Sequence, residues 1–304
     1  MKKKKSFKST IEENWILWAM LVPATVSIIL FAYLPIFGIV VAFQDFDIMK
    51  GFFGSPFVGL DNFRRIASDP MMGNIIRNTV GLSSIKLAIS FPLPIVFALL
   101  LNELRSIKYK RLVQTISYLP HFVSWVIVIG IFMKLIAYED GVVNLAMEKM
   151  GMERINFAIQ SWFMWPLAIF TSVWKEIGWS AIIYLAALTS IDPQLYEAAT
   201  VDGASRWKQM LHVTLPGIKS TIVILLILEI PSIVSSNRDQ MWVLGTLPVR
   251  DVTEVIDTYV LRQGLSNMEY SMATAVGLVK SAISLILIIS VNAIARRLGE
   301  EGVF

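Results

Sequence analysis

The sequence predicts an all-α polytopic membrane protein with six membrane-spanning helices. Of its 304 residues, 55% are hydrophobic and 16% are charged, and the mean hydropathy is +0.63. Soluble domains carry about 25% charged residues, so this balance is typical of a chain that lies mostly in lipid. The length of the apolar runs and the distribution of the basic residues between them support the same conclusion.

Six stretches reach the length of about 20 residues that a helix needs to cross a hydrocarbon layer of about 30 Å. They are residues 15–43, 78–101, 113–137, 162–190, 216–236 and 272–295. The first stretch has Trp15 and Trp18 where an interfacial aromatic belt is expected, and Pro23 and Pro35 are predicted to kink it. A cleaved signal peptide is the alternative for Lys2–Lys5 and the run after them, but that run is too long.

The basic residues predict the orientation of the chain. Thirteen Lys and Arg residues lie in residues 1–14, 102–112, 191–213 and 296–304, against nine in the longer loops on the opposite side. The positive-inside rule therefore places both termini in the cytoplasm. We accordingly divide the chain into a basic tail (1–14), a first span with its extracellular loop (15–77), a core of five spans (78–295) that includes a cytoplasmic loop at 192–216, and a short tail (296–304).

Several classes of chemistry find no support in the sequence. There is no cysteine, and the two histidines, His121 and His212, are far apart without an H-E-x-x-H pattern, which argues against a metal site. We expect His121 to be structural. Gly217-Ile218-Lys219-Ser220 lacks the glycine-rich loop that cradles phosphates, and no serine lies in a G-x-S-x-G pattern. The +4 net charge comes from the short cytoplasmic segments and requires no nucleic-acid partner.

The segment 196–216, YEAATVDGASRWKQMLHVTLP, is unusually polar for this chain. Asp192 and Pro193 are suited to the N-cap and first position of a short helix with its body at Gln194 to Asp202. Gly203 is suited to the left-handed residue that ends it. Ser205 then caps a second short helix, predicted at Arg206 to Val213 and ending near Pro216.

Each of these helices is too short to be stable alone in water. Their apolar residues therefore need a partner surface, in the manner of a helix that binds in a groove. These residues are Leu195, Tyr196, Val201, Trp207, Met210 and Leu211.

The spacing of Glu197-Ala198-Ala199, Gly203, Val213 and Leu215-Pro216 resembles the EAA loop of ABC importer permeases, which usually has Ile where Val213 stands. Three further segments resemble the maltose-type carbohydrate-uptake group of binding-protein-dependent inner membrane components, and in particular its LplB-like oligosaccharide and polysaccharide branch. They are FVGLDNFRRI (57–66), YLPHFVSWVIVIGIF (118–132) and VIDTYVLRQGL (255–265). Residues 231–244 are more polar than in that branch, which affects the inferred substrate.

The resemblance implies a bacterial cell-membrane permease with a cytoplasmic coupling helix. Such a chain pairs with a second homologous permease, docks two ATPase subunits that bind ATP and Mg²⁺, and receives a carbohydrate from an extracellular solute-binding protein; it binds no cofactor itself. Glu197 is expected to pair with a basic residue of the ATPase, Gly203 to form the turn and Trp207 to anchor the loop. The coupling residues are Glu197, Ala198, Ala199, Asp202, Gly203, Arg206, Trp207, Leu215 and Pro216. The alternative is an amphipathic linker at the lipid surface.

Charges within spans are hypotheses for a transport pathway. Lys175 and Glu176 share a helix face with Trp179, and the spacing of Glu229, Ser232 and Ser236 predicts one polar stripe on the fifth span. An aromatic ring beside hydrogen-bonding groups suits a sugar. The predicted pathway residues are Trp125, Lys175, Glu176, Trp179, Glu229, Ser232 and Ser236, with Trp174 and Tyr184 as further aromatic candidates.

Two other intramembrane lysines, Lys86 and Lys280, are expected to snorkel or to pair structurally. For each single aromatic residue, ordinary packing is the alternative to a pathway role. The leading hypothesis is a carbohydrate importer permease without an ATP site of its own. The other hypotheses are an importer of a different solute, such as a peptide or polyol, and a membrane scaffold or sensor that does not transport.

Overall fold

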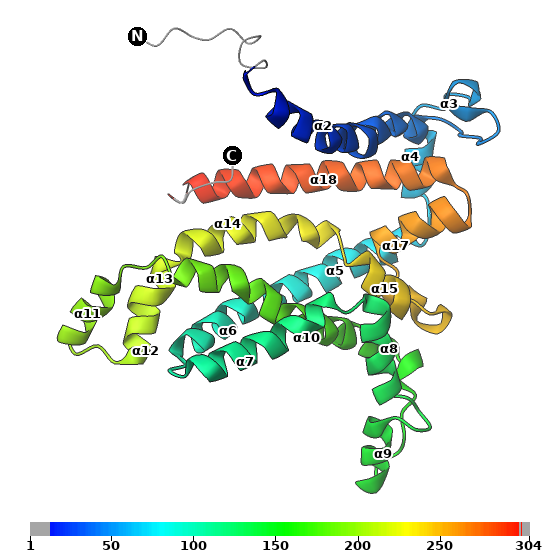
Figure 1. Ribbon diagram of the computed structural model, residues 1–304. Helices are drawn as coiled ribbons and strands as arrows, with labels where there is room; N and C mark the ends of the chain where they lie inside the picture. The colour runs from blue at the N-terminus through cyan, green and yellow to red at the C-terminus, as the bar shows by residue number, and fades with distance from the viewer. Residues whose placement is uncertain (1–12, 298, 300–304) are drawn as a thin grey trace. The chain divides into compact units, whose positions relative to one another are not determined.

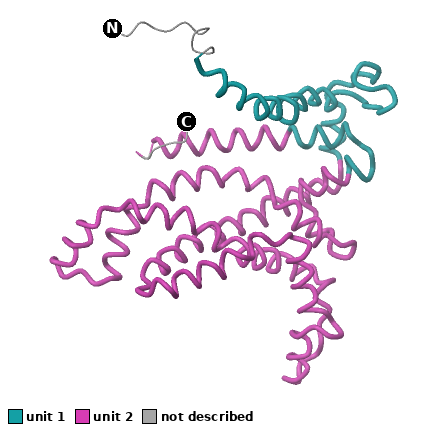
Figure 2. The backbone as a smooth tube through the Cα atoms, viewed as in Figure 1, with its two compact units in different colours: residues 1–68, 263–278 teal, residues 69–262, 279–304 magenta. Residues whose placement is uncertain are grey.

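The computed structural model describes residues 13–297 and residue 299, so most of the two predicted tails lies outside it. The described residues are helical, apart from loops and one isolated bridge between Gln44 and Phe57. They fall into two compact units (Figure 2). The first holds residues 1–68 and 263–278, and the second holds residues 69–262 and 279–304.

The first unit begins with one long helical stretch. It consists of α2 (Trp15–Ile28), a π turn (Ile29–Tyr33) and a 3₁₀ segment (Leu34–Phe43). The helix continues through Pro23, and its winding changes just before Pro35, which has no N–H to donate. After α3 (Gly51–Gly54), α4 (Asp61–Ala67) returns to this stretch. The buried Asn62 amide donates to the carbonyls of Ala42 and Gln44 at 3.0 and 2.9 Å.

The second unit contains most of the helices (Figure 1). They are α5 (Met72–Ser90), α6 (Pro92–Glu103), α7 (Ile107–Tyr118), α8 (Trp125–Leu135), α9 (Val142–Lys149), α10 (Ser161–Leu188), α11 (Pro193–Val201), α12 (Arg206–Gln209), α13 (Leu215–Gly217), α14 (Lys219–Glu229), α15 (Arg238–Leu244), α16 (Arg250–Thr253) and α17 (Ile256–Leu261). Short 3₁₀ turns lie at Leu119–Phe122, Phe157–Ile159, Ile230–Val234 and Leu247–Val249, and π turns at Met210–Thr214 and Arg262–Ser266. The last helix, α18 (Tyr270–Arg297), begins in the first unit and ends in the second.

Four helical stretches of the described chain are long and apolar enough to cross a membrane: Trp15–Phe43, Met72–Glu103, Lys219–Leu244 and Tyr270–Arg297. A fifth is obtained if α7 with its 3₁₀ turn and α8 are counted as one span. The predicted span at 113–137 is therefore wrong as a continuous helix, because the chain bends there by 103°. Pro120 lacks an N–H, Val123 is extended, and the Ser124 hydroxyl caps α8 by accepting from the N–H of Ile127 at 3.4 Å.

The helix α10 corresponds to the predicted span at 162–190 but is not among these apolar stretches. Its 28 residues extend over about 42 Å at about 1.5 Å per residue, which is more than enough to cross. Its apolarity is reduced by Thr171, Ser172, Lys175 and Glu176. These side chains must therefore be accommodated by protein rather than by lipid.

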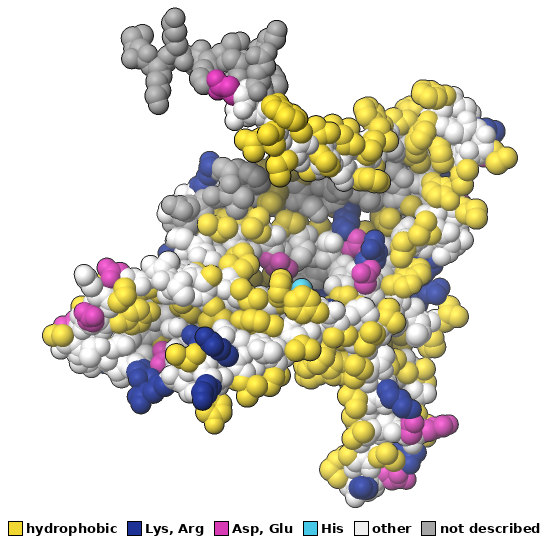
Figure 3. All heavy atoms as spheres, viewed as in Figure 1, with side chains coloured by type: hydrophobic (Ala, Val, Ile, Leu, Met, Phe, Trp, Pro, Cys, Tyr) yellow, Lys and Arg dark blue, Asp and Glu magenta, His cyan; other side chains and the backbone are white. Residues whose placement is uncertain are grey.

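The packing of the second unit is centred on α10. One buried cluster joins its residues Leu167 and Ala168 to α5, α8 and α15, and a second joins Ala181, Tyr184 and Leu188 to α6 and α14. Most other faces carry exposed hydrophobic side chains, which Figure 3 shows in yellow, as expected of helices that face lipid. The helix α10 thus carries the core of this unit along its whole length.

Gly178 allows α7 and α10 to come into close contact. A Cβ atom at this position would lie 2.3 Å from the carbonyl oxygen of Ser117 and 2.5 Å from its carbonyl carbon. A backbone group cannot rotate away as a long side chain can, so only glycine fits between these helices. The contact fixes the end of α7 next to the bend at residues 119–124.

We expect Gly178→Ala to destabilise the protein by about 1–3 kcal/mol, the usual penalty for overpacking a core. The measurement is the apparent melting temperature of the detergent-purified protein. Gly130→Ala is the matched control, because Gly130 lies in α8 with nothing within 4 Å of its added Cβ. An equal melting temperature for the Gly178 variant and the control would contradict the role of Gly178.

Candidate functional site

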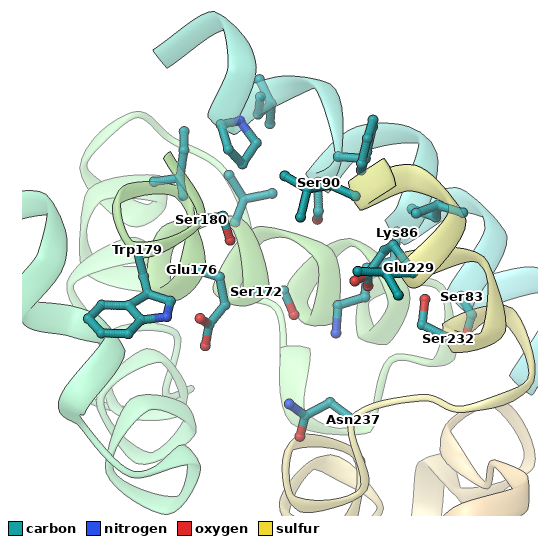
Figure 4. Close-up of a pocket in the computed structure, with 18 of the residues that line it drawn as sticks. Ser83, Lys86, Ser90, Ser172, Glu176, Trp179, Ser180, Glu229, Ser232 and Asn237 are labelled. Carbon is teal, nitrogen blue, oxygen red and sulfur yellow. The ribbon is translucent and has the colours of Figure 1, made fainter. Parts of the chain in front are cut away.

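A cavity of about 690 Å³ lies in the second unit, between α5, α6, α8, α10 and α14 (Figure 4). Its wall combines aromatic rings with hydroxyl groups, two carboxylates and one ammonium group. The polar lining residues are Ser83, Lys86, Ser90, Ser172, Glu176, Ser180, Glu229, Ser232, Ser235, Ser236 and Asn237. Among helices that face lipid, such a concentration of polar groups is the expected mark of a functional site.

Six of the seven predicted pathway residues line this cavity. Trp125 comes from the start of α8, and Glu176 and Trp179 come from α10. Glu229, Ser232 and Ser236 come from α14 and the segment after it. In Figure 4, Glu176 and Trp179 lie on one side and Glu229 and Ser232 on the other.

The prediction of a regular polar stripe on the fifth span is wrong. The helix α14 ends at Glu229, and the chain continues as a 3₁₀ turn that has Pro231 near its start and ends at Val234. Proline fixes φ and removes a donor, so regular winding stops there. The three polar residues reach the cavity by this change of winding, and the Ser236 hydroxyl lies 2.7 Å from that of Ser83.

Lys175, the seventh predicted residue, is not among the lining residues. Its side chain is 6% exposed, and its amine donates to the carbonyls of Pro120, at 3.4 Å, and His121. Nζ also lies 3.6 Å from a carboxylate oxygen of Glu176. Lys175 therefore supplies a donor to the carbonyl of His121 at the bend after α7, and a second donor to that of Pro120, which also accepts from the N–H of Val123 at 3.1 Å.

His121 connects this bend to the cavity wall. Its Nδ1 lies 2.7 Å from Oε2 of Glu176, and its ring stacks on that of Trp179 with centroids 4.3 Å apart and planes 2° from parallel. Three neighbouring residues of α10, Lys175, Glu176 and Trp179, thus hold the bent segment. Two of them also line the cavity.

A buried polar network that the sequence did not indicate lies behind the cavity wall and includes two lining residues, Lys86 and Ser172. Gln240 of α15 is fully buried, and its amide nitrogen donates to the carbonyl of Ala168 at 2.7 Å and to the hydroxyl of Thr171 at 2.8 Å. Its oxygen accepts from Ser172 at 3.1 Å and from Nζ of Lys86 at 2.9 Å. Gln240 lies outside the predicted spans, so no pattern in the sequence joined it to them.

The other residues singled out from the sequence have different environments. Lys280 pairs with Asp257 and donates to Ser235 at 3.0 Å, which confirms its predicted structural pairing. Tyr184 lies on the cavity wall. Trp174, which is not among the lining residues, packs edge-on against Phe132.

The polar segment after α10 forms the predicted helix–turn–helix element (Figure 1). Asp192 caps α11 by accepting from the N–H of Gln194 at 2.9 Å, Gly203 has φ of +74°, and Ser205 accepts from the N–H of Lys208 at 3.5 Å. These three predictions are confirmed. The second helix, predicted to end at Val213, instead continues as α12, a π turn and α13 to Gly217.

The two halves of this element are joined within the chain. The Tyr196 hydroxyl donates to Thr214 at 3.0 Å, and the Gln209 amide donates to Thr200 at 3.0 Å. Met210 is buried in the core rather than available to a partner, which corrects its prediction as a docking residue. Glu197 is exposed, as are Leu195, Val201 and Trp207 at 53%, 88% and 64%.

Basic side chains gather at the same end of the unit (Figure 3). Arg206 forms an ion pair of 3.6 Å with Glu103, at the end of α6; Arg105 in the loop that follows and Lys108 in the first turn of α7 are exposed. The remaining predicted coupling residues, Ala198, Ala199, Asp202, Leu215 and Pro216, all lie in α11, its cap or α13. Within residues 13–297, no group of three His, Cys, Asp or Glu could hold a metal ion.

Comparisons with known proteins agree along the chain. Residues 90–300 match the family model of the binding-protein-dependent transport system inner membrane component. A polygalacturonan/rhamnogalacturonan transport system permease protein, YteP of Bacillus subtilis (strain 168), is 44% identical over 100% of this chain and 94% of its own length. Protein LplB of the same organism is 40% identical over 98% of this chain and 94% of its own length.

This chain is also similar in fold and sequence to a solved structure. A chain of a bacterial ABC transporter involved in import of the acidic polysaccharide alginate matches with a TM-score of 0.89 and 36% identity. The match covers 96% of this chain and 99% of that chain. The chain described here therefore belongs to the family of binding-protein-dependent transport system inner membrane components, which are multi-pass permease subunits of the bacterial cell membrane.

Proposed function

We propose that this chain is the permease subunit of an ABC importer that moves a carbohydrate, either an oligosaccharide or a polysaccharide fragment, into the cytoplasm. The observation that carries the proposal is the cavity, where Trp125 and Trp179 lie with carboxylates and hydroxyl groups between lipid-facing helices. Relatives over nearly their full length are named as carriers of polygalacturonan or alginate, which supports the same class of substrate.

The chemistry of the wall fits a sugar. A sugar ring has apolar faces that stack on indole rings, and hydroxyl groups around its edge that donate to carboxylates such as Glu176 and Glu229. The volume of about 690 Å³ lies within the range of about 300–1,000 Å³ typical of sites for organic ligands. A site for a bare ion would be much smaller and would gather its ligands around one point.

In this proposal, α10 is the fourth of six spans, and both termini and the 192–216 loop lie in the cytoplasm. The length of α10 and the positions of its polar side chains both support the proposal that α10 spans the membrane. Lys175 faces the bend after α7, and Ser172, Glu176 and Ser180 face the cavity. None of these groups has to be placed in hydrocarbon, so a helix that is too polar by composition can still cross.

Two ATPase subunits, which bind ATP and Mg²⁺, would dock on the exposed surface of α11 and α12. Their closure would move this element, and the Tyr196–Thr214 bond and the buried Met210 and Ile218 would pass the movement to α14. Glu229 lies at the far end of α14, on the cavity wall. A second permease subunit and an extracellular binding protein would complete the importer; the solved alginate transporter includes a complex with its pentasaccharide-bound periplasmic protein.

The six-span topology predicts that Glu153 and Gln194, which flank α10, lie on opposite sides of the membrane. Because the chain has no cysteine, Glu153→Cys and Gln194→Cys each introduce a single label site. A membrane-impermeant maleimide should modify position 153 in spheroplasts and position 194 in inverted vesicles, both prepared from cells that lack the ATPase subunits. Labelling of both positions from one side would contradict a spanning α10.

The coupling role predicts that Gly203→Val abolishes uptake, while the chain remains in the membrane. A β-branched residue is strained by about 1–2 kcal/mol at a left-handed φ, so the turn between α11 and α12 would shift. Gly203→Asn is the matched control, because asparagine adopts this conformation readily. The measurements are sugar uptake by reconstituted vesicles and co-purification of the ATPases. Normal uptake by the valine variant would count against this role.

The proposed cavity function predicts that the double variant Trp179→Ala, Glu229→Ala assembles with its partners but shows neither sugar uptake nor substrate-stimulated ATP hydrolysis. The stacking surface and a hydrogen-bond acceptor for the sugar would both be absent. Trp15→Ala is a suitable control, since Trp15 is exposed and does not line the cavity. Unchanged uptake by the double variant would refute the assignment of this cavity, and a wild-type importer that moves no carbohydrate would refute the proposed function.

A further inference from the structure

Lys86 differs from Lys175 and Lys280 because no carboxylate lies within ion-pair distance of its amine, and Glu176 and Glu229 act on it only over a longer range. Lys175 lies 3.6 Å from Glu176 and donates to two carbonyls, and Lys280 is paired with Asp257. Within the described part of the chain, Lys86 forms no ion pair; Nζ donates to the Gln240 oxygen at 2.9 Å and lies 6.0 Å from the centre of the Trp125 ring. It is the one lysine or arginine on the described cavity wall.

An unpaired ammonium group is costly at this depth. Moving a charge into a bilayer is unfavourable by several kcal/mol, so an intramembrane lysine is by default a candidate for a functional site. Snorkelling does not explain Lys86, because its amine is bound to the buried Gln240 and not to the membrane surface. Gln240 is itself fixed by Ala168, Thr171 and Ser172, so the position of the amine is set by the core.

The geometry leaves part of this amine available to a ligand. Lysine has three N–H donors, and Gln240 accepts from one of them. The lining hydroxyls of Ser83 and Ser232 lie on the same side of the cavity as Lys86 in Figure 4. A positive group beside neutral hydroxyls and an aromatic ring is suited to a sugar that carries a negative charge.

We propose that Lys86 binds a carboxylate of the transported carbohydrate and thereby selects a uronic-acid saccharide. This inference rests on the proposed function and names the substrate class of the same cavity. The bond is a charge-assisted hydrogen bond, which is shorter and stronger than the bonds that the hydroxyl groups offer. Lys86 therefore distinguishes a uronic acid from the neutral sugar of the same shape.

The charges of the wall favour a carboxylate over a phosphate. Glu176 and Glu229 lie on the same cavity, and Glu176 is already engaged by His121 and Lys175. A phosphate ester has a charge close to −2 at neutral pH and would face one ammonium group and these two carboxylates. A carboxylate has a single charge, so it is attracted by Lys86 and repelled less by Glu176 and Glu229 than a phosphate would be. The hydroxyl groups of the same sugar can donate to Glu229.

The test compares Lys86→Gln and Lys86→Arg in the complete importer, reconstituted in vesicles with its partner permease, ATPases and receptor. The first probe is trigalacturonate, and the second is its methyl ester, which has the same shape without charge. We expect Lys86→Gln to reduce trigalacturonate uptake about tenfold or more, since it removes one charge-assisted hydrogen bond. Uptake of the ester should change less than twofold, and Lys86→Arg should restore most of the trigalacturonate uptake.

The glutamine variant leaves the core hydrogen bonds in place, because Ser172 still donates to Gln240. Equal losses for both probes, or no loss for either, would overturn the proposal. If the receptor does not deliver the ester, the arginine variant decides: trigalacturonate uptake that is restored by arginine supports the proposal, and uptake that is equal with arginine and glutamine overturns it.

A wild-type importer that moves no carbohydrate would refute the proposed function without settling the role of Lys86. Calorimetric titration of trigalacturonate into the detergent-purified wild-type and Lys86→Gln importers then decides. About tenfold weaker binding to the variant supports the proposal, and equal or undetectable binding to both overturns it.

Discussion

The architecture of the second unit depends on how it satisfies the backbone at the bend after α7. A bilayer offers no water to free carbonyl groups, so a helix can break there only where protein supplies donors. The N–H of Val123 donates to Pro120, Lys175 donates to Pro120 and His121, and the neighbouring Glu176 binds the His121 side chain. Because these two residues are adjacent on α10, the same turn that stabilises the bend also brings a carboxylate to the cavity. The same turn of α10 therefore both supports the bend and forms part of the cavity wall.

The helix–turn–helix element at residues 192–216 could be predicted in detail because its signals are local. Asp192, Gly203 and Ser205 act on backbone groups within a few residues, and each has the predicted role. Four of the six predicted spans correspond to apolar helical stretches of the described chain, since length and composition determine whether a helix suits a bilayer. The cavity residues that could be predicted are mainly polar side chains within apolar helices, because such side chains stand out in the sequence.

The features that could not be predicted depend on contacts between distant segments. The bend at residues 119–124 has a proline as its only local sign, and the lysine that supports it is more than fifty residues away. The partnership of Gln240 with Lys86 joins residues 154 positions apart. The sequence predicts that Lys86 snorkels or pairs structurally, but it could not show that the partner is a buried amide rather than a carboxylate. A hydropathy profile identifies a charged residue within an apolar span. The role of that residue depends on the side chains that lie next to it in the fold, which the profile does not show.

The Gln240 network also bears on how transporters of this kind diversify. Its bonds to Ala168, Thr171 and Ser172 hold the core of the unit whatever residue stands at position 86. Lys86 is thus held by Gln240, whereas the other hydrogen bonds of Gln240 do not involve Lys86. A substitution at this position would change the charge of the wall and leave the bonds of Gln240 to Ala168, Thr171 and Ser172 in place. If Lys86 selects the substrate as proposed, a change of substrate preference therefore requires no change in these core bonds.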